Sequence, residues 1–162
     1  MNSFSHFNQN GEASMVDVSE KLITERTALA SCWIRMKRET FQLLKSGAVK
    51  KGDAFTIAKI AGIQAAKRTA ELIPLCHPLA LDSIKISIFD RKEEDGFMIE
   101  AQVKSGSKTG VEMEALTAAS FAALGLYDMA KSHDLSMAIE DLHLIYKKGG
   151  KSEFQGRSAD GQ

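Results

Sequence analysis

The stretch Leu72-Ile73-Pro74-Leu75-Cys76-His77-Pro78-Leu79 separates a helical pattern from a strand pattern, and it holds both prolines of the 162-residue chain. Proline fixes φ, lacks a backbone N–H donor and disfavours helix in the residue before it, so the preceding helix must end here. The stretch is therefore a stiff bend that presents the thiol of Cys76 and the imidazole of His77. Rigid presentation suits a catalytic or ligand-binding site, but a helix-to-strand connector with an incidental histidine explains the same residues.

The spacing of apolar residues on both sides of this bend predicts the fold class. Alternation over 84–89 and again over 97–103, with a charged turn between them, indicates an antiparallel hairpin. The other predicted elements are a strand over 27–37, a short helix over 39–45, a helix from an Asp53 N-cap to about residue 73, a helix over 112–132 and a strand over 135–147 that is interrupted near 140–141. This order predicts an α+β fold, a ferredoxin-like βαββαβ sandwich whose four-stranded antiparallel sheet has two main helices on one face.

Charge and cysteine content argue against a nucleic-acid-binding or membrane-binding protein and against a disulfide scaffold. Basic and acidic residues number 21 each, and a net charge of zero argues against a protein built mainly to bind nucleic acid or a membrane surface. Cys32 and Cys76 are too few and too far apart for a disulfide scaffold, so we expect reduced thiols in a cytoplasmic protein. Residues 1–14 lack the apolar core of a signal peptide, and we expect one catalytic domain over 15–151 between flexible tails over 1–14 and 152–162.

One helical segment indicates contact with another subunit. Residues 115–126 are apolar nearly all round, whereas a helix that covers one sheet needs a single apolar stripe. We therefore expect the second face of this helix, or the open face of the sheet, to contact another copy. A net charge of zero favours such self-association over repulsion.

Several groups of polar side chains besides His77 are candidates for chemistry. Glu112-Met113-Glu114 opens the helix over 112–132, where carboxylates also occur simply because they favour a helix N-terminus. Asp128 and Lys131 share one face of that helix. A surface ion pair is the more common outcome of this spacing, and a pair with tuned pKa values at the edge of buried surface is the alternative.

The other motifs argue against a phosphate-binding-loop NTPase, a metal site and an RNA-binding sheet. Lys50-Lys51 lies in a loop beside Asp53, and the segment 147–152 looks like half of a phosphate-binding loop. It fails that test, because Ile145 stands where the first glycine is required and no helix follows. The histidines have no ligand-like spacing to the Cys76-His77 pair, no nucleophile elbow is present, and the aromatic residues of an RNA-reading sheet are missing.

Seven motifs occur in one order along the chain: Met15-Val16-Asp17-Val18-Ser19, Lys51-Gly52-Asp53, Ile60-Ala61-Gly62-Ile63-Gln64-Ala65-Ala66-Lys67-Arg68-Thr69, the proline bend over 72–79, Thr109-Gly110-Val111-Glu112-Met113-Glu114-Ala115-Leu116-Thr117-Ala118, Tyr127-Asp128-Met129 and Gly149-Gly150-Lys151-Ser152. Together they resemble the MoaC family, the cyclic pyranopterin monophosphate synthases of molybdenum cofactor biosynthesis. The resemblance covers about residues 15–152.

This resemblance implies a lyase that acts after a radical SAM enzyme has joined the ribose of GTP to its base. Its substrate would be that cyclised dihydro-GTP (3′,8-cyclo-7,8-dihydro-GTP), and its products cyclic pyranopterin monophosphate and pyrophosphate. The resemblance also implies a homohexamer, a trimer of dimers whose active sites are shared between subunits. It implies no cofactor, although a divalent cation could accompany the triphosphate, and neither nucleic acid nor a membrane as partner.

Carried over position by position, the resemblance implies catalytic roles for Asp128, Lys131, Lys51 and His77. It implies substrate binding by Leu75, Cys76, His77, Glu112, Met113, Glu114 and Lys147, and no metal ligand. Two positions depart from the family's pattern: Ala130 stands where many members have cysteine, and Glu153 stands where glycine is usual.

Two other classes of function use the same residues. A ligand-sensing ferredoxin-like module would bind a nucleotide without converting it and would not need the pair Asp128 and Lys131. A structural partner protein would use its apolar helix to dock another chain and would be indifferent to nucleotides. The density of motifs over the whole chain favours the enzyme over both.

Overall fold

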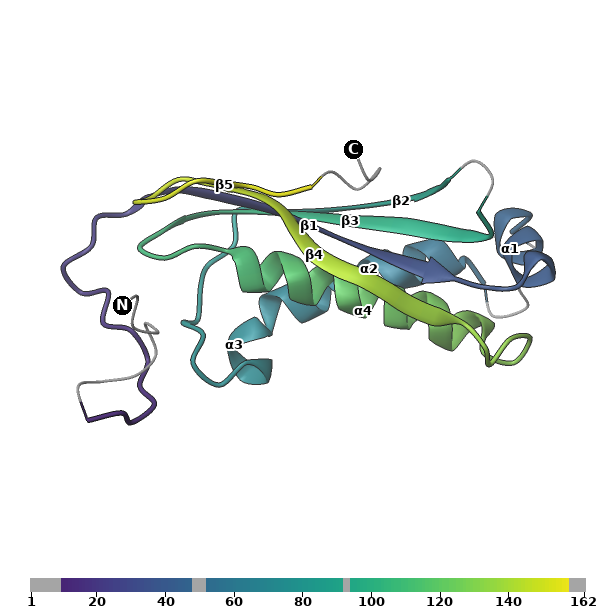
Figure 1. Ribbon diagram of the computed structural model, residues 1–162, viewed down its shortest axis with the longest axis horizontal. Helices are drawn as coiled ribbons and strands as arrows, with labels where there is room; N and C mark the ends of the chain where they lie inside the picture. The colour runs from purple at the N-terminus through teal and green to yellow at the C-terminus, as the bar shows by residue number, and fades with distance from the viewer. Residues whose placement is uncertain (1–9, 48–51, 92–93, 158–162) are drawn as a thin grey trace.

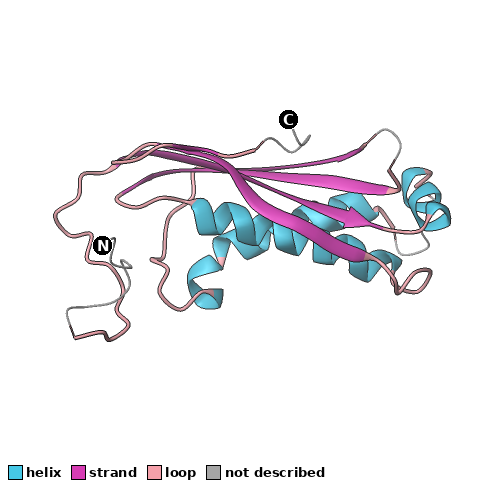
Figure 2. Ribbon diagram, in the orientation of Figure 1, coloured by secondary structure: helices cyan, strands magenta, loops and turns pink. Residues whose placement is uncertain are grey.

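The computed structural model describes residues 10–47, 52–91 and 94–157, in which one antiparallel sheet carries the two long helices on a single face (Figure 1, Figure 2). The elements are β1 (Thr24–Arg35), α1 (Arg38–Lys45), α2 (Ala54–Lys67), α3 (Thr69–Leu72), β2 (Ser83–Asp90), β3 (Gly96–Ser107), α4 (Glu112–Ala130), β4 (Ala138–Lys148) and β5 (Phe154–Gln155). No helix in these described ranges is long and apolar enough to cross a bilayer. The predicted α+β class is confirmed.

The sheet has the order β2-β3-β1-β4-β5, with β1 in the middle. Alternate residues of β1 face the helices and are fully buried, namely Ala28, Ala30, Cys32 and Ile34. The predicted hairpin is confirmed, since β2 pairs with β3 in a register that sets Ile84 opposite Val103. This inward-facing alternation fixes the register, because a slip of one residue would expose the whole buried set.

The prediction of four strands is wrong, because the sheet has a fifth. After β4 the chain turns through Gly149 and Gly150, which have φ of +93° and +80°. The turn returns β5 alongside β4, with Phe154 opposite Lys147 and Gln155 opposite Tyr146. The sequence reading placed these residues in a polar tail. The strand was missed because a strand of two residues is held by backbone hydrogen bonds and so requires no alternation of apolar side chains in the sequence.

Small residues let α2 and α4 lie close together beneath the sheet. A Cβ added at Gly62 of α2 would lie 2.6 Å from the carbonyl oxygen of Ala118, and one added at Gly125 of α4 would lie 2.9 Å from the Cα of Ala58. Alanines with no exposed surface fill the buried faces of α4 towards α2 and the sheet, namely Ala115, Ala118, Ala119, Ala122 and Ala123. The two helices therefore form one close-packed layer.

The helix that was expected to run from the Asp53 N-cap to about residue 73 is divided at Arg68. The N-cap is confirmed, because Asp53 accepts a 3.0 Å hydrogen bond from the backbone N–H of Thr56. At the division, the buried hydroxyl of Thr69 donates to the carbonyl of Ala66 at 3.0 Å and so competes with the helical hydrogen bonds. α3 then adds one turn before the proline bend.

The expected interruption of the last strand is confirmed as a β-bulge. Asp141 has φ of 53°, and the pairing of β1 with β4 shifts register between Ser31 and Trp33. Such an extra residue bends a strand and increases its twist.

Asp134 fixes the loop between α4 and β4, and the sequence reading did not single it out. It is almost fully buried and accepts hydrogen bonds from the backbone N–H groups of Lys37 and Ser136, both at 2.9 Å, and from the Ser136 hydroxyl at 2.6 Å. These hydrogen bonds, the one from the Ser136 hydroxyl foremost, lower the pKa of Asp134 to about 2. The carboxylate therefore joins the end of α4 to the start of α1.

We predict that Asp134→Ala destabilises the fold by on the order of 2 kcal/mol at neutral pH, because three donors lose a charged acceptor. Since the folded-state pKa is depressed, this contribution is present above pH 3.8 and disappears as the pH falls through about 2. Urea unfolding of both proteins between pH 2 and 7 measures it. A difference in stability that does not shrink in acid would contradict the assignment.

Candidate active site

The largest grouping of predicted site residues lies around one cavity of about 400 Å³, which we call the main cavity. Its walls come from the N-terminal segment, the proline bend and the start of α4. The lining residues are Val16, Lys21, Leu75, Cys76, His77, Leu79, Thr109, Gly110, Glu112, Met113 and Glu114. Six of the predicted residues are therefore brought together here, from two segments that are far apart in the sequence.

His77 is held by the N-terminal segment. Its Nε2 lies 2.8 Å from the carbonyl oxygen of Val16. A carbonyl oxygen can only accept, so Nε2 carries a proton and the neutral ring keeps Nδ1 as an acceptor. The proline bend and Val16 together fix both the orientation and the tautomer of this imidazole.

Glu114 is the buried acid of the main cavity, with 4% of its surface exposed. Burial raises its pKa to about 7, and the nearby charge of Glu112 acts in the same direction. Burial, assisted by Glu114, also raises the pKa of the Cys76 thiol. The cavity thus contains a carboxyl group that can give or take a proton near neutral pH and a thiol that stays protonated.

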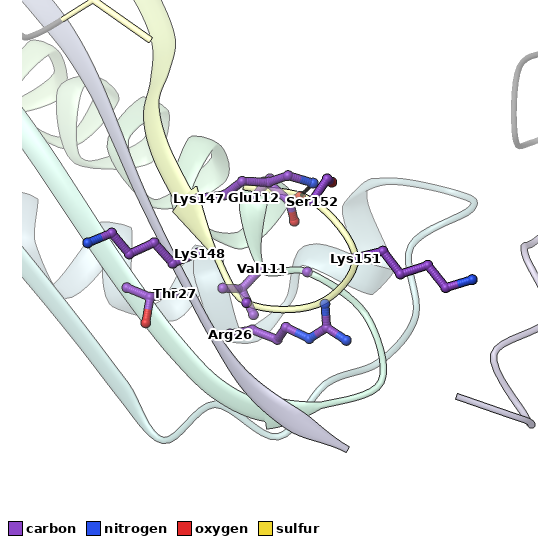
Figure 3. A pocket seen from close by; sticks show the side chains of 10 residues that line it. Arg26, Thr27, Val111, Glu112, Lys147, Lys148, Lys151 and Ser152 are labelled. Atoms are coloured by element: carbon purple, nitrogen blue, oxygen red, sulfur yellow. Dashed lines mark ion pairs between the residues drawn. The ribbon is translucent and has the colours of Figure 1, made fainter. Parts of the chain in front are cut away.

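A second, smaller opening shares Gly110 and Glu112 with the main cavity, and we call it the basic cleft. Its lining residues are Arg26, Thr27, Gly110, Val111, Glu112, Lys147, Lys148, Gly149, Lys151 and Ser152. Lys147 forms a 2.8 Å ion pair with Glu112, and Figure 3 shows Lys148 pointing away from that pair. The cleft has four cationic side chains and one carboxylate, which suits an anionic ligand.

Asp128 and Lys131 do not join this site within one chain. They lie in the last turn and at the C-cap of α4, at the opposite end from Glu112, and sixteen residues of helix correspond to about 24 Å. Their side chains are 63% and 50% exposed and form a 2.6 Å ion pair, which raises the pKa of Lys131. The pair is a surface ion pair in the single chain. Lys51, the fourth predicted catalytic residue, lies outside the described residues.

Several residues of the site were not predicted individually. Val16 and Thr109 lie within quoted motifs, but nothing in the sequence indicated that a backbone carbonyl of the first motif would contact His77. Lys21 and Arg26 lie outside every motif. In the sequence, Arg26 is an ordinary polar residue beside a predicted strand. Only the folded structure, which brings these distant segments together, shows that they belong to the site.

Comparison with known proteins identifies the family of this chain. The model of the MoaC family matches residues 15–150, which is most of the chain. The chain belongs to the MoaC family. One curated member, from Lysinibacillus sphaericus (strain C3-41), is named cyclic pyranopterin monophosphate synthase. It is 49% identical to this chain over 154 residues, covering 94% of this chain and 96% of the relative. The residues matched by the MoaC family model include all three walls of the main cavity and the ion pair of Asp128 and Lys131.

We predict that Glu114→Gln changes the pH dependence of stability. Between pH 4.5 and about 7 the folded protein binds more protons than the unfolded chain, so wild-type stability falls as the pH rises through this window. The neutral amide removes this penalty, and the variant should gain up to about 3 kcal/mol relative to wild type on going from pH 4.5 to 8.

Urea midpoints across this range test the shift, with exposed Glu153→Gln as the matched control. A constant difference between Glu114→Gln and wild type at all pH values would show that Glu114 ionises normally.

Proposed function

We propose that this chain is a cyclic pyranopterin monophosphate synthase. It converts 3′,8-cyclo-7,8-dihydro-GTP into cyclic pyranopterin monophosphate and releases pyrophosphate, in molybdenum cofactor biosynthesis. The observation that carries the proposal is the convergence of six family-matched residues on the main cavity. Membership of the MoaC family and the name of the 49% identical relative support it.

The side chains of the two openings supply the chemistry that this reaction needs. Rearranging a dihydropurine fused to ribose into a pterin requires proton transfers, for which Glu114 has a pKa near neutrality and His77 has a fixed tautomer. Closing the cyclic phosphate requires a sugar hydroxyl to attack the innermost phosphorus while pyrophosphate leaves. The lysines of the basic cleft, Lys147 among them, would neutralise the departing charge.

The catalytic pair completes the site, we propose, from a neighbouring subunit. Asp128 and Lys131 lie about one length of α4 away from the main cavity, so one copy alone cannot bring them to the same ligand. Apolar side chains on the outer surfaces of α2 and α4 are available for subunit contact: Ile57, Ile60, Phe121 and Leu124 are 45%, 47%, 37% and 48% exposed. This exposure supports contact between subunits, and the family resemblance implies that the assembly is a homohexamer, a trimer of dimers.

Three further proposals follow from the same assignment. The strand order β2-β3-β1-β4, with α2 and α4 on one face, supports a ferredoxin-like fold extended by β5. The enzyme acts in the cytoplasm on a small molecule. It uses no resident cofactor, and any divalent cation arrives with the triphosphate. Among the described residues, no three His, Cys, Asp or Glu side chains group to hold a metal.

Mixing two inactive variants tests the shared site. His77→Ala and Lys131→Ala should each fold and give almost no product from the cyclised dihydro-GTP. When their subunits are exchanged, roughly a quarter of wild-type activity should return, because that share of sites receives both intact halves. Pyrophosphate release and the cyclic phosphate product are the readouts.

A mixture of Asp128→Ala with Lys131→Ala is the matched control, because both substitutions affect the same half of the site and no exchange restores it. Failure of the first mixture, with exchange verified by native mass spectrometry, would contradict the shared site. A wild-type protein that binds the substrate without converting it would contradict the enzyme itself.

Removing divalent cations tests the cofactor proposal. We predict that dialysis against EDTA leaves the melting temperature unchanged and that any loss of turnover returns fully on adding Mg²⁺ with substrate. A lowered melting temperature, or activity that only another metal restores, would indicate a resident metal ion.

A further inference from the structure

Arg26 joins two loops that surround both openings. It lies near the start of β1 and is half-buried. Its Nε donates to the carbonyl of Ser107 at 3.3 Å, and its Nη2 donates to the carbonyl of Lys108 at 3.4 Å. The two hydrogen bonds thus go to the last backbone carbonyl of β3 and to the first carbonyl of the loop between β3 and α4. The planar fork of the guanidinium makes this double contact, which a single ammonium cannot reproduce.

The opposite side of the same guanidinium faces the turn between β4 and β5. Gly150 has φ of +80°, and a Cβ added there would collide with Nη1 of Arg26. At neighbouring Gly149, with φ of +93°, an added Cβ would collide with the carbonyl oxygen of Glu25. The turn is therefore packed directly on β1, and Figure 3 shows Arg26 beneath it. The positive φ favours glycine at both positions, and at Gly149 the fixed backbone carbonyl also leaves no space for a Cβ.

The segments that meet at Arg26 carry the working parts of the candidate site. The β3–α4 loop leads into Thr109 and Gly110 of the main cavity. The same loop holds the N-terminal segment, because Nζ of Lys108 donates to the carbonyl of Ser19 at 2.8 Å. On the other side, the turn connects Lys147, paired with Glu112, to Lys151. A displacement of Arg26 would move all of these groups.

We propose that Arg26 is a positioning residue for the reaction. By joining the β3–α4 loop to the turn at Gly150, it sets where the cations of the basic cleft stand relative to the main cavity, and so aligns the substrate's phosphate chain for in-line displacement. This inference rests on the proposed function. Arg26 acts through the two loops that its guanidinium holds together, and its positive charge is not what the reaction uses.

Two substitutions of Arg26 separate geometry from charge. Arg26→Lys keeps the charge but loses the fork, and Arg26→Met loses both. If Arg26 positions the loops, each variant should lower kcat for cyclic phosphate formation by about tenfold or more, because small misplacements of reacting groups are costly. Melting temperatures should stay within a few degrees of wild type. Normal turnover by Arg26→Lys beside an impaired Arg26→Met would overturn the proposal, since charge alone would then suffice.

Gly150→Ala tests the same contact from the turn, without altering Arg26. It should reduce kcat as the Arg26 variants do. Gly11→Ala is the matched control, because Gly11 has a similar φ of +78° and no atom within 4 Å of an added Cβ. A Gly150→Ala enzyme as active as Gly11→Ala would also overturn the proposal.

Hydrogen exchange gives a readout that needs no substrate. Amides of 149–156 should exchange faster in Arg26→Lys than in wild type, while those of β1 and β3 keep their protection. Unchanged exchange in the turn would contradict the positioning role. This measurement also separates the two proposals: a wild-type chain without product formation refutes the function, whereas the exchange result tests the contact by itself.

Discussion

The close contact of α2 with α4 determines where every functional segment lies. Two glycines and a row of alanines allow these helices to approach until backbone meets backbone, at Gly62 against Ala118 and at Gly125 against Ala58. Because the two helices run antiparallel on the same face of the sheet, the end of α2 comes beside the beginning of α4 (Figure 1). The proline bend that follows α2 and α3 is thereby brought to the acidic first turn of α4. Larger side chains at this contact would separate the two walls of the main cavity.

The distribution of charge along α4 follows from its length. The helix has small, buried apolar residues along one side of its middle and carries its titratable groups only at its ends. At one end, Glu114 is withdrawn from water and its pKa lies near 7. At the other end, Asp128 and Lys131 remain hydrated and paired. The same helix therefore offers a desolvated proton carrier and a solvent-exposed ion pair, and only assembly of several copies could bring the two kinds of group to one ligand.

Much of this arrangement could be predicted from the sequence, and the reasons for the exceptions are physical. Alternation located the β2–β3 hairpin, and the two prolines located the bend, because both signals are local. The break at Arg68 was missed because it depends on the buried hydroxyl of Thr69, whose effect appears only once the helix is packed. β5 was missed because two backbone-paired residues leave no pattern.

The site shows the same division between local and tertiary signals. Leu75, Cys76 and His77 line one cavity together with Glu112, Met113 and Glu114. The family resemblance named these residues for substrate binding, and that role stays a prediction. The motifs gave no indication of Arg26, Val16 or Asp134, whose roles depend on backbone atoms from distant segments. A side chain that bonds to remote carbonyls or amides imposes no spacing rule on the sequence, so only the folded chain can reveal it.

The bulge at Asp141 affects whether sheets of different molecules can pair edge to edge. β4 would otherwise present a long outer edge of unpaired amides and carbonyls, which can recruit strands from other molecules. β5 covers this edge only opposite Tyr146 and Lys147, and the left-handed Asp141 interrupts it farther along. A short covering strand and a kink together leave little straight edge for uncontrolled polymerisation on this side of the sheet. The β4 edge of the sheet thus resists pairing with strands of other molecules, although apolar side chains of α2 and α4 are exposed elsewhere on the surface.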